Sequence, residues 1–141
     1  MNLLRIERML EQGIMNTLPH VRVAPTAIPG KPSKFWVGIP QKDREEYSRF
    51  CSGVLRLESQ GKIRYLVFRN GRNPRPDLGR GKFDLTRPSS VILGHMDGQG
   101  GFKPKVQIHW ATDLPIGATE TDAAAYLLNL VRAEFYNGNP A

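Results

Sequence analysis

The chain has few of the residues that build disulfides, metal sites or membrane spans. Its 141 residues include one cysteine, Cys51, and three histidines, so an internal disulfide is excluded and no metal-ligand spacing is present. No apolar run reaches the roughly 20 residues that a membrane-spanning helix needs. Charges at Arg5, Glu7, Arg8 and Glu11 interrupt the apolar pattern of the N-terminus, unlike a signal peptide. We therefore expect one soluble domain, made in the cytoplasm, without metal or cofactor.

Catalytic motifs are equally scarce. The segment 97–101 is rich in glycine but lacks the Gly-Lys-Ser/Thr ending of a phosphate loop, and no serine has a nucleophile-elbow context. His95, His109 and Lys105 match the acid, base and phosphate anchor of a small basic ribonuclease. Because any chain with three histidines offers such a pair, we expect no enzyme and keep the ribonuclease as an alternative.

Basic residues are in excess, and they are concentrated. The chain carries 20 Lys and Arg against 13 Asp and Glu, a formal net charge of +7. Nine of the basic residues, but only three acidic ones, fall between Arg56 and Arg87. A basic surface attracts phosphate backbones because neutralising phosphates releases counterions. The charge pattern therefore favours nucleic-acid binding over a scatter of solvated arginines.

The sequence predicts an α+β fold: an antiparallel sheet of about five strands, a C-terminal helix that packs across a dimer, and a short N-terminal helix. The predicted helices are 2–12, stopped by Gly13, and 120–136, capped by Thr119. The predicted extended segments are 20–24, 34–39, a hairpin over 53–69, 82–87 with 90–93 (two strands, or one bent at Pro88) and 105–112. The domain divides into a helix and proline-rich arm (1–49), the sheet (50–113) and the terminal helix (119–137).

The hairpin predicts a sheet with two unlike faces. A three-residue loop, 59–61, would place Arg56 opposite Arg64 and collect the apolar side chains on the other face. That apolar face would hold Leu55, Leu57, Ile63, Tyr65 and Val67. The strand 105–112 alternates in the same way. Val106, Ile108 and Trp110 point one way, and Lys105, Gln107 and His109 point the other.

The C-terminal helix is apolar around most of its circumference. A helix that covers one sheet face needs only an apolar stripe, so a helix that is apolar nearly all round needs cover on several sides. We therefore predict a second subunit that contacts Tyr126, Leu127, Leu130 and Val131. A helix enclosed within a compact monomer is the alternative.

Three stretches carry a resemblance to a known family. They are SGVLRLESQGKIRYLVFRNGR (52–72), KPKVQIHWATDLP (103–115) and TETDAAAYLLNLVRAEFYNGNP (119–140). In their order and character they resemble coat proteins of single-stranded RNA bacteriophages (levivirus-like), over about two-thirds of the chain. The chain differs in having an N-terminal helix and one terminal helix instead of two, so the first helix replaces a missing packing element.

The resemblance implies a structural capsid protein, virion-located and made in a bacterial host. Such proteins form homodimers by edge-to-edge sheet pairing, assemble into icosahedral shells and bind genomic RNA on the inner sheet face, where a hairpin can repress translation. The implied RNA-binding residues are Arg56, Lys62, Arg64, Lys105, Gln107 and His109. The implied inter-dimer loop, 94–104, contains Gly94, Gly98, Gly100 and Gly101. A nucleic-acid-binding regulator that does not assemble is a further alternative.

Overall fold

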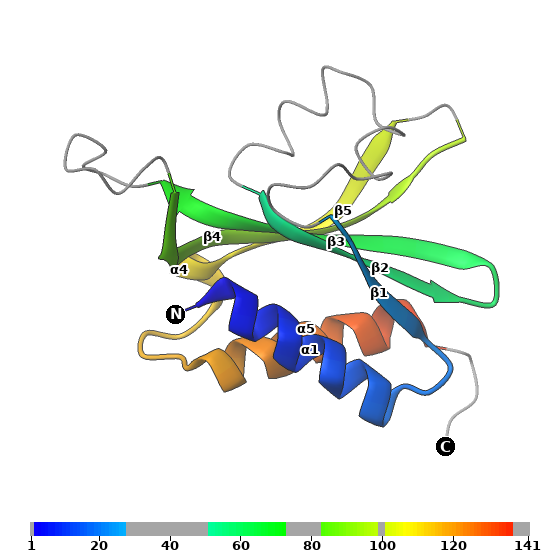
Figure 1. Ribbon diagram of the computed structural model, residues 1–141, viewed down its shortest axis with the longest axis horizontal. Helices are drawn as coiled ribbons and strands as arrows, with labels where there is room; N and C mark the ends of the chain where they lie inside the picture. The colour runs from blue at the N-terminus through cyan, green and yellow to red at the C-terminus, as the bar shows by residue number, and fades with distance from the viewer. Residues whose placement is uncertain (1, 28–50, 73–82, 99–100, 137–141) are drawn as a thin grey trace.

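Five antiparallel strands form one sheet in which neighbours along the chain are neighbours in space. The computed structural model describes residues 2–27, 51–72, 83–98 and 101–136. The strands are β1 (Arg22–Ala27), β2 (Cys51–Ser59), β3 (Lys62–Arg72), β4 (Phe83–Met96) and β5 (Phe102–His109), in the order β1-β2-β3-β4-β5 (Figure 1). The predicted α+β class is confirmed. β1 shows that the sheet begins inside the segment predicted as a proline-rich arm, and the predicted segment 34–39 lies outside the described residues.

Two helices cover the same face of this sheet, which we call the helix face. α1 (Leu3–Thr17) and α5 (Glu120–Glu134) lie side by side beneath the strands (Figure 1). Asn2 caps α1. The predicted cap of α5 at Thr119 is present as a capping box, in which Thr119 and Asp122 are bonded reciprocally. α1 therefore supplies a second helix beside α5 on this face.

α1 is longer than predicted, because it continues through Gly13. A Cβ atom at this position would lie 3.3 Å from Cδ2 of Leu128 on α5. The glycine therefore serves close helix–helix approach instead of ending the helix, and the prediction of a stop at Gly13 was wrong.

The main core lies between the helices and the helix face. The helices supply buried side chains at helical spacing, and the strands supply every second residue. The fully or nearly fully buried members include Leu3, Ile6, Leu10, Ile14, Leu55, Leu57, Leu66, Phe68, Val91, Leu93, Leu127 and Val131. Trp110, at the start of the short helix α4 (Trp110–Asp113), joins this core as predicted.

The β2–β3 hairpin exists, but its predicted register was wrong. Ser59 pairs with Lys62 across a two-residue loop, and both loop residues have positive φ, 52° at Gln60 and 81° at Gly61. Positive φ at both positions is the requirement of a type I′ turn, whose twist matches that of the flanking strands. The two-residue loop puts Arg64 opposite Leu57, so every β3 side chain lies on the other face from the one predicted.

Replacing Gln60 tests this turn. Asparagine tolerates left-handed backbone better than glutamine, so Gln60→Asn is expected to raise the free energy of unfolding by about 0.5 kcal/mol. Gln60→Val should lower it, because a β-branched residue is strained at positive φ. Urea denaturation measures both changes, and a stabilising valine would contradict a type I′ turn.

The remaining strands differ from prediction mainly in length. β4 is one continuous strand with an irregular register where Pro88 lies opposite Asn70, which agrees with the bent-strand alternative. β4 and β5 extend into the segment predicted as a long glycine-rich loop, which shortens the connection to residues 97–101. The final predicted strand is also shorter at its end, since α4 begins at Trp110.

Candidate nucleic-acid interface

A buried carboxylate collects three cations at the C-terminal end of α5. Glu134 Oε1 lies 2.8 Å from Arg64 Nε and 3.5 Å from Lys62 Nζ, and its Oε2 lies 2.5 Å from Lys105 Nζ. The Glu134 side chain is 3% exposed. We call these four residues the cation cluster. It joins β3, β5 and α5, and it brings together three of the six predicted RNA-binding residues.

Two local features of the backbone, a turn and a β-bulge, bring the residues of the cation cluster together. The two-residue turn places Lys62 and Arg64 on the helix face, in line with the core residue Leu66. On β5, Val106 pairs with Leu93 and Pro104 with Gly94, so Lys105 is the extra residue of a β-bulge. A bulge redirects a side chain, and here it allows Lys105 to reach α5 from the sheet edge.

The cations set the protonation of Glu134 and close the end of its helix. Burial alone would raise the pKa of Glu134, but hydrogen bonds from Lys105 and Arg64 and the charge of Lys62 hold it below its ordinary value. Lys62 also donates to the Glu134 carbonyl and lies 5.4 Å from the ring centroid of Phe135. His20 Nε2 donates to the Phe135 carbonyl at 3.1 Å. Donors at the C-terminus of a helix satisfy free carbonyls and oppose the negative end of its dipole.

The other predicted RNA-binding residues lie on the opposite face of the sheet, which we call the far face. Arg56 alternates with the core residues Leu55 and Leu57, and its Nη1 lies 2.7 Å from Oε2 of Glu58. Gln107 and His109 are exposed on β5, opposite Ile92 and Ser90. The prediction that all six residues share one cationic face was therefore wrong, because the true register separates Arg56 from Arg64.

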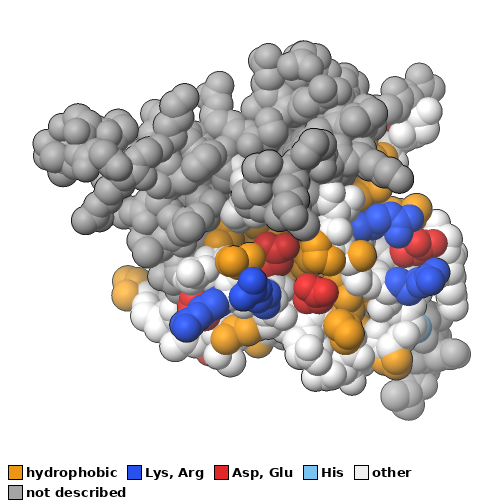
Figure 2. Space-filling view, in the orientation of Figure 1, with side chains coloured by type: hydrophobic (Ala, Val, Ile, Leu, Met, Phe, Trp, Pro, Cys, Tyr) orange, Lys and Arg blue, Asp and Glu red, His pale blue; other side chains and the backbone are white. Residues whose placement is uncertain are grey.

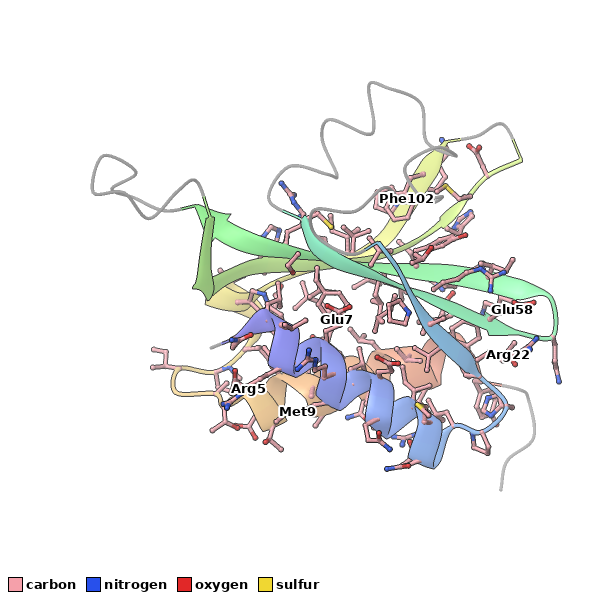
Figure 3. All side chains as sticks on the ribbon, viewed as in Figure 1. Arg5, Glu7, Met9, Arg22, Glu58 and Phe102 are labelled. Atoms are coloured by element: carbon pink, nitrogen blue, oxygen red, sulfur yellow. The ribbon has the colours of Figure 1, made fainter. Side chains whose placement is uncertain are left out.

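The far face is itself largely apolar at its centre. Val54, Val67, Ile92 and Phe102 form a second buried cluster, with Cys51, Tyr65 and Met96 packed against it. Phe102 lies on the side of the sheet away from the helices (Figure 3). Tyr65 thus packs against apolar residues, but on the face opposite to the one predicted. Burial raises the pKa of the half-buried Cys51 to about 12, so its thiol is unreactive at neutral pH.

The four residues predicted to form the dimer interface differ in how far they are exposed. Leu127 and Val131 are fully buried in the core of their own chain, and Leu130 is partly buried against it. Tyr126 is 39% exposed. Most of the apolar circumference of α5 is thus covered by the sheet and α1, so the argument that Leu127 and Val131 require a partner was wrong.

The glycine-rich connection is held closed by Asp97. The Gly101 amide donates to Asp97 Oδ1 at 2.8 Å, and the Asp97 amide donates to the Gly101 carbonyl at 2.8 Å. Gly98 has open space around it, whereas Gly94 lies within β4, where an added Cβ would come within 2.5 Å of the Lys103 carbonyl. Gly94 is therefore a strand residue and not part of a loop, and Gly100 lies outside the described residues.

The residues of the ribonuclease alternative do not converge. His109 pairs with Ser90 and His95 with Lys103, so about 16 Å of strand separates the two histidines along β4. They also lie on opposite faces of the sheet, since His95 alternates with the far-face residue Met96. Within the described ranges, no group of three or more His, Cys, Asp or Glu side chains is placed to hold a metal ion.

Sequence reasoning missed two buried acids, Glu134 and Glu7. Glu7 is 6% exposed, and its Oε2 has no hydrogen-bond partner. It points from α1 toward the sheet, whereas Met9 points away (Figure 3), and a Cβ atom at Gly53 would lie 2.7 Å from its Oε2. Burial, reinforced by the charge of Glu11 and opposed by Arg8, raises the pKa of Glu7 to about 7. The available signal was an acidic residue at a core-facing position of each helix.

No family model, curated protein or solved structure matches this chain. No helix in the described part of the chain combines the length and the apolar character that a membrane crossing requires.

Proposed function

We propose that this protein is a structural coat protein that associates with copies of itself and encloses single-stranded RNA in a closed shell. The observation that carries the proposal is the order of elements: five antiparallel strands in chain order, then a capped C-terminal helix. The resemblance at 52–72, 103–115 and 119–140 implies this arrangement. A net charge of +7 supports it, because a shell protein that packs RNA must offset phosphate charge.

The RNA contact is best supported along β5 and the cation cluster. Lys105, Gln107 and His109 are exposed on this edge strand. Lys105 and Lys62 are 55% and 39% exposed, and the cation cluster holds three cations against one carboxylate. The helix face of this edge carries the local positive excess, and Gln107 and His109 on its far face add polar groups able to donate hydrogen bonds to phosphate. Arg56 is a weaker candidate, because Glu58 already neutralises it.

Removing the charge of Lys105 tests this contact. Lys105→Gln is expected to weaken RNA binding and to reduce the slope of log affinity against log salt by about 1, the change for one lost phosphate contact. Arg5→Gln is the matched control, since it removes one exposed cation from α1. Fluorescence anisotropy with a labelled RNA, across a salt series, measures both. Equal effects of the two substitutions would contradict an RNA contact on β5.

The complete proposal is tested by expressing the chain alone and treating the purified product with ribonuclease. A closed shell should protect its RNA, and electron microscopy should show uniform particles tens of nanometres across. A protein that binds RNA but leaves it fully digestible would be a non-assembling regulator instead. Cleavage of RNA by the purified protein, lost in His109→Ala, would favour the ribonuclease.

A further inference from the structure

One side of α1 carries a short stripe of residues that is free of the core. Leu4, Arg8, Glu11 and Met15 recur at spacings of four, three and four, which places them along one line of a helix. Leu3, Ile6, Leu10 and Ile14 turn toward the core, and Gly13 faces α5, so the stripe points away from α5. Figure 2 shows hydrophobic, basic and acidic side chains adjacent to one another on the front of the molecule, where α1 lies.

The stripe is apolar at both ends and charged in the middle. Leu4 is 45% exposed and Met15 is 58% exposed. Between them, Arg8 is exposed and Glu11 is partly exposed. Neither makes an ion pair with any residue in the described ranges, whereas the neighbouring Arg5 pairs with Glu120.

This order of side chains is complementary to itself when it is reversed. In an antiparallel pair of α1 helices related by a two-fold axis between Met9 and Leu10, Leu4 lies opposite Met15 of the partner subunit. Arg8 then lies opposite Glu11 of the partner subunit, and each contact occurs twice. A parallel pair would oppose Arg8 to itself, which like-charge repulsion disfavours.

We propose that the stripe Leu4, Arg8, Glu11 and Met15 pairs with the same stripe of a second copy in an antiparallel, two-fold contact. One helix face per subunit is smaller than a standard interface, so the contact is weak in dilute solution and gains strength where copies are concentrated. It goes beyond the proposed function, because it identifies a self-contact that holds with or without RNA.

Engineered cysteines test the direction of pairing. The double substitution Leu4→Cys with Met15→Cys, in protein freed of RNA by ribonuclease and high salt, should form a disulfide-linked dimer on mild oxidation. Leu4→Cys alone should stay monomeric on a non-reducing gel, and it also controls for Cys51. Crosslinking of the single variant would indicate a parallel contact and overturn the proposal. Absence of crosslinking in a double variant with native circular dichroism would also overturn it.

Charge reversal tests the central pair independently. Arg8→Glu and Glu11→Arg should each weaken association at least about tenfold in sedimentation equilibrium, and the combined substitution should restore it. Failure of the combined variant to recover would contradict the contact. The outcomes separate this inference from the proposed function: RNA-filled particles without crosslinking remove only the α1 contact, and crosslinked dimers without particles remove only the shell.

Discussion

Glu134→Gln is expected to lower the free energy of unfolding by about 2–3 kcal/mol at pH 7, because it leaves three cations around a neutral group. The loss should fall short of the largest values for buried pairs, since Lys62 and Lys105 remain partly solvated. Glu58→Gln is the matched control. It breaks a more exposed pair with Arg56 and should cost about 0.5 kcal/mol. Urea denaturation of both variants measures the difference, and equal losses would contradict a cation cluster that anchors α5.

The pH dependence of this effect has a definite sign. The pKa of Glu134 is lower in the folded protein than its ordinary value of 4.5. Its contribution to stability is therefore complete above pH 4.5 and is lost as the pH falls through the folded pKa. The stability difference between wild type and Glu134→Gln should accordingly shrink in acid.

Glu7→Gln is expected to raise the free energy of unfolding at neutral and alkaline pH. The pKa of Glu7 rises from 4.5 to about 7 on folding, so the folded protein binds the extra proton and loses stability as the pH rises between these values. At pH 8 the ionised carboxylate, whose buried Oε2 has no hydrogen-bond partner, costs about 3 kcal/mol relative to acid. Glu7→Gln removes this cost, so the variant should be more stable than wild type at pH 8 and nearly equal to it at pH 5.

Thermal unfolding of wild type and Glu7→Gln from pH 5 to 8 tests this prediction by comparing the stability of the two proteins at each pH. Glu11 and Arg8 on α1, and Cys51 on β2, are the titratable groups that interact with Glu7, and both proteins contain them. Glu58→Gln is a suitable control, because it removes a partly exposed acidic charge on β2 that does not act on Glu7. Parallel pH curves for wild type and Glu7→Gln would show that Glu7 is solvated or paired.

The elements with local signals were predicted, and the contacts between them were not. The capping box at Thr119 and Asp122 depends on residues three apart, and the β2–β3 hairpin depends on alternation around Gly61. The register of that hairpin was not predicted, because both faces of the sheet are apolar. Val54 and Val67 are as buried as Leu55 and Leu66, so alternation alone could not identify the helix face.

The residue types of the candidate site were predicted, but their predicted arrangement was wrong. Lys62, Arg64 and Lys105 were singled out by charge, but their shared partner is Glu134, a distant residue within an apolar helix. Their meeting depends on a positive φ at a glutamine and on a bulge at Lys105, and neither has a strong sequence signature. Exposed Gln107 and His109 on β5 agree with the predicted polar side of that strand.

Sedimentation velocity of the purified protein tests the coat-protein proposal most directly. The boundary is recorded at roughly 260 and 280 nm, where nucleic acid and protein absorb respectively, so that RNA carried by a basic protein is detected. The proposal predicts a fast, uniform boundary far larger than a 15.8 kDa chain, with nucleic-acid absorbance moving in the same boundary. A slow boundary of single chains free of nucleic acid, persisting at high protein concentration and low salt, would contradict it.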